Sequence, residues 1–304
     1  MNALNDQKMK LIKMKKPRRI NPNTILKTFL LVGIVGLIIG SFADLKISQL
    51  LYMRAGFYPN FFRLTGEMPM ILTLVSVSFA QISNTIKRDD KSSQEIILIV
   101  LALLAILIAP FISAGGIINY FAFFKSSHRY LIYAFYLITG FFLSKLYNRL
   151  ADKEIRIFFI FALSVVILSI LSMSILKDVW SRARFHPMHV ANDYSDFSPW
   201  YLPQFRANPI DDYRSFPSGH TTSATTMLML LYLPFDRLNQ SEKKWITAFS
   251  ISWPLLVALA RILDGAHYLS DVSAAFILSS GLIFLAMKIV DLIKKKFNIP
   301  VSHG

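Results

Sequence analysis

Two histidines of this chain stand in settings that suit catalysis. His267 and Asp271 are four residues apart, so on a helix their side chains share one face. A carboxylate placed there can hold an imidazole N–H, fix its tautomer and stabilise the charge that develops during attack. We therefore expect His267 to be a nucleophile. His220 has no carboxylate at helical spacing, and we expect it to protonate the leaving group as a general acid.

Three cations accompany these histidines: Lys177, Arg184 and Arg261. The transition state of phosphoryl transfer spreads negative charge over the equatorial oxygens, so catalysis is mainly positioning and cationic stabilisation. The arginine fork matches phosphate bidentately and lysine adds a point charge. These residue types predict phosphoryl transfer through a phosphohistidine at His267, with no metal and no cofactor required.

The segment before His220 offers a place for the phosphate. Ser218 and Gly219 open a predicted helix, whose free N–H groups and positive dipole end favour an anion. Glycine at 219 lets the backbone approach a phosphate oxygen closely. The ordinary alternative for Ser218 is a helix N-cap, and the alternative for His267 with Asp271 is a structural hydrogen bond.

Long apolar runs must position these residues. The chain has 304 residues, is 54% hydrophobic and has a mean hydropathy of +0.47. A helix needs about 20 apolar residues to cross a bilayer. We predict an all-α, polytopic transmembrane bundle of about eight helices, as a single domain over 24–298 after a basic cytoplasmic tail over 1–23. The predicted spans are 24–43, 66–85, 95–115, 129–148, 156–177, 219–235, 246–263 and 269–290.

Loop charges set the expected orientation. With a cytoplasmic N-terminus, the inside segments carry 21 basic residues and the outside segments carry ten, as the positive-inside rule requires. We thus expect both termini in the cytoplasm and the site at the outer face of the plasma (inner) membrane. The net charge of +15 is then explained by topology and anionic headgroups, and nucleic acid is not an expected partner. The chain has no cysteine, which excludes disulfides and thiolate metal sites.

Three segments together resemble the signature of the type 2 phosphatidic acid phosphatase (PAP2) superfamily. The first part of the signature is a lysine followed, after six residues, by Arg-Pro, and it corresponds here to Lys177 and Arg184-Phe185. The second part, Pro-Ser-Gly-His, is intact at 217–220. The third part is Ser-Arg, then five residues, a histidine, three residues and an aspartate, and it corresponds to Ala260-Arg261, His267 and Asp271. Phe185 replaces the proline and Ala260 replaces the serine. Neither change removes a charged or nucleophilic group, so we expect activity to be kept.

The resemblance implies a role for each signature residue within 177–271. Phosphate would be bound by Lys177, Arg184, Ser218, Gly219 and Arg261; His220 would be the acid; His267 with Asp271 would supply the nucleophile. It implies a bacterial membrane lipid phosphatase whose partners are a lipid phosphate substrate and membrane lipids. Undecaprenyl pyrophosphate, phosphatidylglycerol phosphate, phosphatidic acid and a lipid A phosphate all fit. Since family members commonly have six helices, one pair among the first four is expected to be an addition.

Other interpretations fit parts of the pattern. A phosphotransferase on the same scaffold would pass phosphate to a sugar or lipid instead of water. A transporter would carry charges nearer the midplane, whereas these cluster at helix ends. His186 and His189 suggest a metal, but we predict no helix there to set their geometry and favour a solvated loop. Arg182 fits an extra phosphate contact and a plain surface arginine about equally.

Overall fold

The computed structural model describes residues 21–54, 56–88, 92–120 and 125–296. All regular secondary structure in these ranges is helical, which confirms the all-α prediction. Most of the predicted basic tail, residues 1–20, lies outside the described residues. Within these ranges, seven helices are long and apolar enough to cross a membrane, which supports a multi-pass membrane protein.

The long helices follow the predicted spans, and most of them extend further at one or both ends. They are α2 (Pro22–Leu51), α4 (Met68–Ile86), α5 (Ser93–Tyr120), α6 (His128–Ser144), α7 (Asp152–Trp180), α10 (Gln240–Leu263) and α11 (Leu269–Lys296). Shorter helices connect them: α3 (Phe57–Thr65), α8 (Phe185–Ala191), α9 (Gly219–Thr225) and the 3₁₀ helices Lys145–Arg149, Asp211–Tyr213, Thr226–Tyr232 and Phe235–Arg237.

The predicted span over 219–235 is a short α-helix followed by a 3₁₀ helix. It begins as α9 and continues without a break as the 3₁₀ helix Thr226–Tyr232. A 3₁₀ helix rises about 2.0 Å per residue against about 1.5 Å in an α-helix, so these two short helices together cover about 24 Å. Nearly all of their side chains are buried, which places them in the middle of the bundle.

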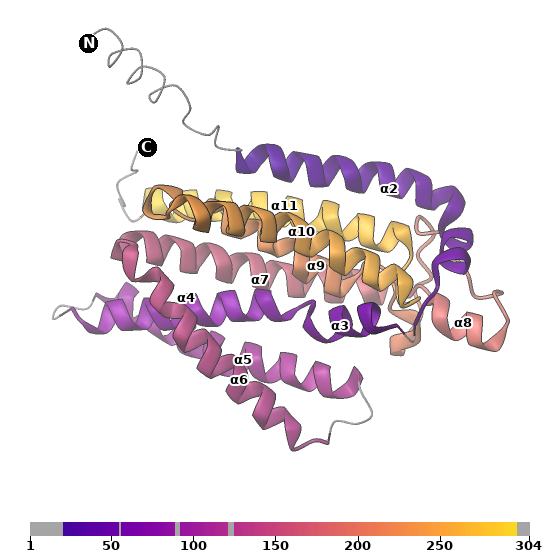
Figure 1. The fold of residues 1–304 in the computed structure, drawn as a ribbon, viewed down its shortest axis with the longest axis horizontal. Helices are drawn as coiled ribbons and strands as arrows, with labels where there is room; N and C mark the ends of the chain where they lie inside the picture. The colour runs from indigo at the N-terminus through magenta and orange to yellow at the C-terminus, as the bar shows by residue number, and fades with distance from the viewer. Residues whose placement is uncertain (1–20, 55, 89–91, 121–124, 297–304) are drawn as a thin grey trace, which may run out of the picture.

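Helix α2 lies along α11 over much of its length (Figure 1). Gly33, Gly36 and Gly40 face α11, and a Cβ atom at any of them would collide with Ser270, Ser273 or Ile277. Small residues at this spacing let two membrane helices approach closely. The close approach carries the far end of α2, including Asp44, to the start of α11.

Helices α5 and α6 pack mainly on α4 and on each other, and they form the splayed lower edge of the bundle in Figure 1. They therefore contribute less to the centre of the bundle than the other long helices do. Their position supports the expectation that one helix pair among the first four is an addition.

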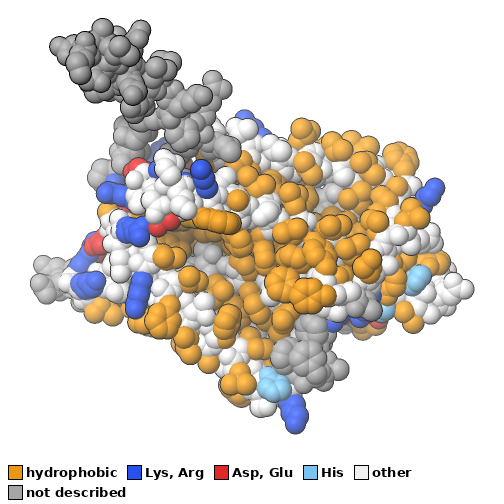
Figure 2. All heavy atoms as spheres, viewed as in Figure 1, with side chains coloured by type: hydrophobic (Ala, Val, Ile, Leu, Met, Phe, Trp, Pro, Cys, Tyr) orange, Lys and Arg blue, Asp and Glu red, His pale blue; other side chains and the backbone are white. Residues whose placement is uncertain are grey.

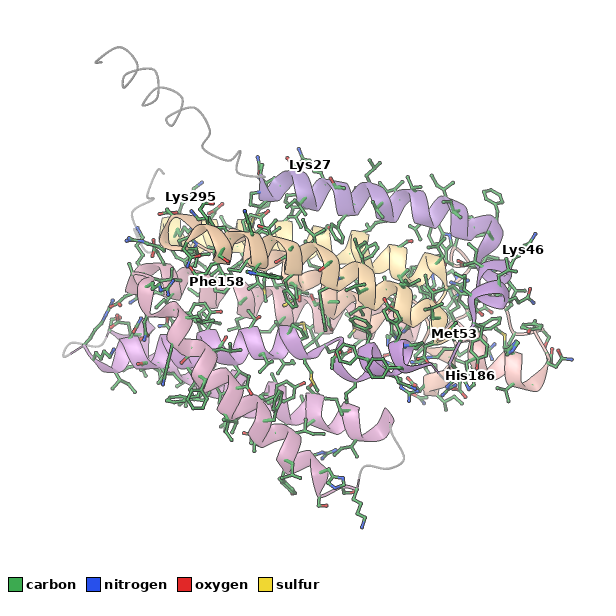
Figure 3. The ribbon with its side chains drawn as sticks, viewed as in Figure 1. Lys27, Lys46, Met53, Phe158, His186 and Lys295 are labelled. Atoms are coloured by element: carbon green, nitrogen blue, oxygen red, sulfur yellow. The ribbon has the colours of Figure 1, made fainter. Side chains whose placement is uncertain are left out.

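The two ends of the bundle differ in composition. Lys295 lies at one end, and Lys46, Met53 and His186 lie at the other, where α8 caps the bundle (Figures 1 and 3). Between the ends, hydrophobic side chains cover the visible face, while Lys and Arg gather toward the ends (Figure 2). Exposed apolar residues such as Ile38, Leu107 and Leu131 suit contact with lipid tails.

Candidate active site

Four segments converge at the end of the bundle that carries α8. These are the last turn of α7 with the loop after it, the start of α9, the turn between α10 and α11, and the start of α11. Gly265 in that turn has a φ of 66°, in the left-handed region that favours glycine. This conformation lets the chain reverse between Arg261 and His267.

His267 is held in one tautomer. Its Nδ1 lies 2.6 Å from the backbone carbonyl oxygen of Ser215. A carbonyl oxygen can only accept, so Nδ1 carries the proton and Nε2 keeps its lone pair. Burial is the main reason why the pKa of His267 is lowered from 6.5 to about 3. The imidazole is therefore neutral near pH 7 and chemically suited to attack.

Asp271 stabilises this arrangement largely through a neighbour. Its Oδ2 lies 3.8 Å from Nδ1 of His267, too far for a hydrogen bond but close enough to favour a positive charge on the ring. The same oxygen accepts from Ser215 Oγ at 2.5 Å and from the Tyr268 N–H at 2.9 Å. The predicted i, i+4 pair is thus present, with Ser215 placed between the two side chains.

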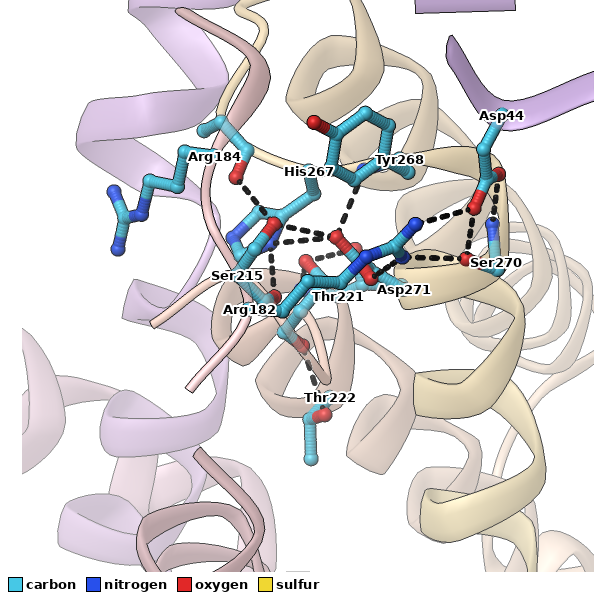
Figure 4. Close-up of polar contacts among 12 residues, drawn as sticks. Asp44, Arg182, Arg184, Ser215, Thr221, Thr222, His267, Tyr268, Ser270 and Asp271 are labelled. Carbon is cyan, nitrogen blue, oxygen red and sulfur yellow. Dashed lines mark hydrogen bonds and ion pairs between the residues drawn. The ribbon is translucent and has the colours of Figure 1, made fainter. Parts of the chain in front are cut away.

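Arg182 is the centre of a buried polar network (Figure 4). It is 1% exposed, and its guanidinium donates to Asp271 Oδ1 at 2.6 Å and to Asp44 Oδ2 at 2.9 Å. Ser270 and the backbone carbonyl of Ser198 accept two further bonds. Both sequence interpretations of Arg182, as a surface residue and as a phosphate contact, were wrong. It ties α2 to Asp271.

The three predicted phosphate-binding cations lie around the same region. Arg184 is paired with Asp211 at 2.7 Å, and the buried Arg261 is paired with Asp264 at 3.0 Å. Both arginines line a cavity of about 530 Å³ at this end of the bundle. Arg54 and Arg63 also line it. These two arginines could not be assigned to the site from the sequence, because they precede the signature by more than a hundred residues.

Ser218 and Gly219 lie at the start of α9, as predicted. Ser218 is its N-cap, and its hydroxyl lies 2.9 Å from that of Thr221. A Cβ atom on Gly219 would lie 2.9 Å from Sδ of Met173 and 3.3 Å from Nζ of Lys177. Glycine here leaves room for the Lys177 ammonium to lie against the backbone that precedes His220.

His220 is buried among residues from several helices. Its Nε2 lies 3.1 Å from the backbone carbonyl oxygen of Arg63, and its Nδ1 lies 3.5 Å from Oε1 of Glu67. No carboxylate at helical spacing accompanies His220 in the sequence. The fold instead supplies one from the junction of α3 and α4, a long-range contact that no local motif could reveal.

Comparison with known proteins agrees with this geometry. Residues 158–295 match the family model of the PAP2 superfamily. We refer to residues 158–295 as the PAP2 domain, since this is the part of the chain that the family model matches. No curated protein and no solved structure matches the chain. Membership supports a phosphatase, and the PAP2 domain contains both histidines, Asp271 and the three signature cations.

The two departures from the PAP2 signature are both packing positions. Phe185 is fully buried and contacts the rings of Tyr52 and Tyr268. Ala260 is buried in an apolar cluster with Phe62 of α3 and Val257. Each replacement thus packs against a residue that precedes the PAP2 domain: Phe185 against Tyr52, and Ala260 against Phe62.

His186 and His189 lie on α8, so the expectation of a loop at this segment was wrong. Their Nδ1 atoms contact the hydroxyl groups of Tyr52 at 2.6 Å and Tyr194 at 2.9 Å. Within the described residues, no group of three or more His, Cys, Asp or Glu is placed to hold a metal ion. These histidines therefore have structural partners.

Proposed function

We propose that this chain is a membrane phosphatase that removes a phosphate group from a lipid phosphate or pyrophosphate through a phosphohistidine. The tautomer of His267 is the observation that carries the proposal. Its Nδ1–H donates a hydrogen bond to the Ser215 carbonyl oxygen, so the lone pair of Nε2 is available for attack on phosphorus. Arg184 and Arg261 supply positive charge that acts on His267, and Lys177 supplies positive charge that acts on His220.

The reaction has two steps on this site. In the first, Nε2 of His267 forms a bond to phosphorus while the bond to the leaving oxygen breaks, and His220 donates a proton to that oxygen. In the second, neutral His220 takes a proton from water, whose oxygen attacks the phosphohistidine. Inorganic phosphate leaves, and the two histidines return to their starting states. Asp271 stabilises the positive charge on the phosphorylated ring.

The position of the site supports a lipid substrate. It lies at the end of an apolar bundle, where a headgroup would sit while acyl or prenyl tails contact the exposed apolar side chains. The positive-inside distribution supports an extracytoplasmic site in the plasma membrane.

Phosphate release from a panel of lipid phosphates and pyrophosphates tests the function. The detergent-purified protein is measured in EDTA beside His267→Ala and the control His128→Ala, which changes a histidine at the start of α6. We expect release by the native protein and the control, and none above background by His267→Ala. Turnover by His267→Ala would refute the nucleophile, and loss in EDTA that a metal restores would refute a metal-free reaction.

The same panel with an alcohol acceptor tests the alternative of a phosphotransferase. Phosphate that appears only on the acceptor would assign the chain to transfer instead of hydrolysis.

A further inference from the structure

The last turn of α3, which contains Arg63, and the junction of α3 and α4, which consists of Gly66 and Glu67, lie against the ring of His220. Arg63 contributes the carbonyl oxygen 3.1 Å from Nε2. Gly66 lies against the ring, since a Cβ atom there would be 3.2 Å from Cδ2 of His220. The indole N–H of Trp253 donates to the carbonyl oxygen of Gly66 at 3.2 Å and so fastens the junction to α10. The junction precedes the PAP2 domain in the chain.

Glu67 is the next residue of this junction, and its Oε1 lies 3.5 Å from Nδ1 of His220. Other charged or titratable groups that act on His220 include Lys177 from α7, Arg261 from α10 and His267 from the turn before α11. Burial raises the pKa of Glu67, and the positive charges of Lys177 and Arg261 oppose this rise and favour the carboxylate. Among these groups, the carboxylate alone favours a positively charged imidazole.

A general acid at this position faces a physical difficulty. It must hold two ring protons before the leaving group departs, yet burial opposes its charge most strongly and the nearby cations oppose it further. Nε2 faces a carbonyl oxygen that can only accept, so its proton stays there. Nδ1 is then the nitrogen that gives and takes the catalytic proton, and a carboxylate beside it favours the protonated state.

We propose that Glu67 is a positioning residue of the active site, whose carboxylate, 3.5 Å from Nδ1, favours the protonated ring of His220 by its charge and leaves the Nδ1 proton available to the leaving oxygen. Transfer breaks the Nδ1–H bond and forms the O–H bond as the phosphorus–oxygen bond breaks, which leaves His220 neutral. The N-terminal helices thereby complete an acid–base pair that the PAP2 domain lacks by itself. This inference rests on the proposed phosphatase function.

The role of Glu67 is tested by measuring kcat of Glu67→Gln and of the native protein on two substrates with different leaving groups. An alkyl phosphate needs a proton on its leaving oxygen, whereas p-nitrophenyl phosphate does not. General acid catalysis contributes roughly 10²–10⁴-fold, and we expect a partner of the acid to account for about 10- to 100-fold. For Glu67→Gln, kcat should fall by that factor on the alkyl phosphate and by less than about 3-fold on p-nitrophenyl phosphate. The alkaline limb of kcat/KM should move to lower pH.

Glu242→Gln is the matched control, because Glu242 lies at the opposite end of α10 from Arg261 and should leave both substrates unaffected. An equal loss on both substrates would overturn the proposal in favour of a purely structural role, and no loss would overturn it outright. Tighter inhibition by inorganic phosphate with unchanged kcat would mean that the carboxylate occupies the phosphate site. Should Glu67→Gln not fold, Glu67→Asp is measured in the same way.

A titration of the ring nitrogens by ¹⁵N NMR separates this inference from the proposed function. The signals of His220, assigned with His220→Gln, should titrate about one pH unit lower in Glu67→Gln than in the native protein. Native protein that is silent on both substrates would contradict the phosphatase, and the NMR shift would still decide the pairing. An unchanged titration would overturn the pairing in an active or an inactive protein.

Discussion

At the scale of single residues, the site depends on where protons are held. The Ser215 carbonyl oxygen keeps the proton of His267 on Nδ1, and Arg182 and Ser215 fix Asp271 nearby. The signature identified His267, His220 and Asp271 because their order and spacing are local properties of the sequence. Arg182, Asp44 and Glu67 could not be predicted in the same way. Their partners lie 89, 138 and 153 residues away, and only the fold brings them together.

Burial of His267 predicts how stability depends on pH. Its pKa is about 3 in the fold and 6.5 when exposed, so between these values the unfolded chain binds the extra proton. The contribution of this neutral ring to the free energy of unfolding is fully present above pH 6.5. It falls by about 1.4 kcal/mol per pH unit as the pH drops toward 3. Melting temperatures in detergent from pH 7 to pH 4 should fall more steeply for the native protein than for His267→Gln. Parallel curves would contradict the burial of a neutral ring.

Gly219→Ala tests the space beside Lys177. The added Cβ would meet Sδ of Met173 and press on the Lys177 ammonium, so we expect KM for a lipid phosphate to rise about 10-fold, which corresponds to about 1.4 kcal/mol. Gly281→Ala is the control, since a Cβ at 281 has nothing within 4 Å. Unchanged KM in Gly219→Ala would show that Lys177 does not depend on this glycine.

At the scale of elements, the close contact between α2 and α11 serves the site as well as the bundle. The helix ranges could be predicted because long apolar runs are visible in the sequence. The pairing of α2 with α11 could not, since a stripe of glycines shows that a helix packs closely without showing on which helix. The α-helix at Phe185–Ala191 was missed because its seven residues carry no clear period.

Asp44→Asn tests the link from α2 to the site. Removing one partner of a buried ion pair costs about 3–5 kcal/mol when the other charge is left alone, and we expect a smaller loss here because Asp271 still pairs with Arg182. We expect a lower melting temperature and a fall in kcat through the loss of order at Asp271. Asp291→Asn, which changes an exposed carboxylate beside Lys294, should alter neither quantity. Native kcat in Asp44→Asn would show that α2 is independent of the chemistry.

At the scale of the whole molecule, the N-terminal third supports the PAP2 domain instead of merely preceding it. Asp44 reaches Arg182, Arg63 and Glu67 reach His220, and Phe62 packs on Ala260. The family signature predicts the catalytic half of the site. It carries no information on segments outside residues 158–295, so the contribution of α2, α3 and α4 appears only in the fold.

The orientation in the membrane can be tested because the chain has no cysteine. Lys46→Cys and Lys295→Cys place a thiol at opposite ends of the bundle (Figure 3). In intact cells, an impermeant maleimide should label Cys at position 46 and should label position 295 only after the membrane is permeabilised. The reverse pattern would place the site on the cytoplasmic side.

The most direct test of the account is to trap the phosphorylated enzyme. The native protein is mixed with ³²P-labelled lipid phosphate and quenched in alkali, in which phosphohistidine survives, and the labelled peptide is sequenced by mass spectrometry. We expect label on His267, in amounts that increase in His220→Gln with p-nitrophenyl [³²P]phosphate because water is then activated poorly. Label on another residue, or rapid turnover with no covalent phosphate in any variant, would contradict it.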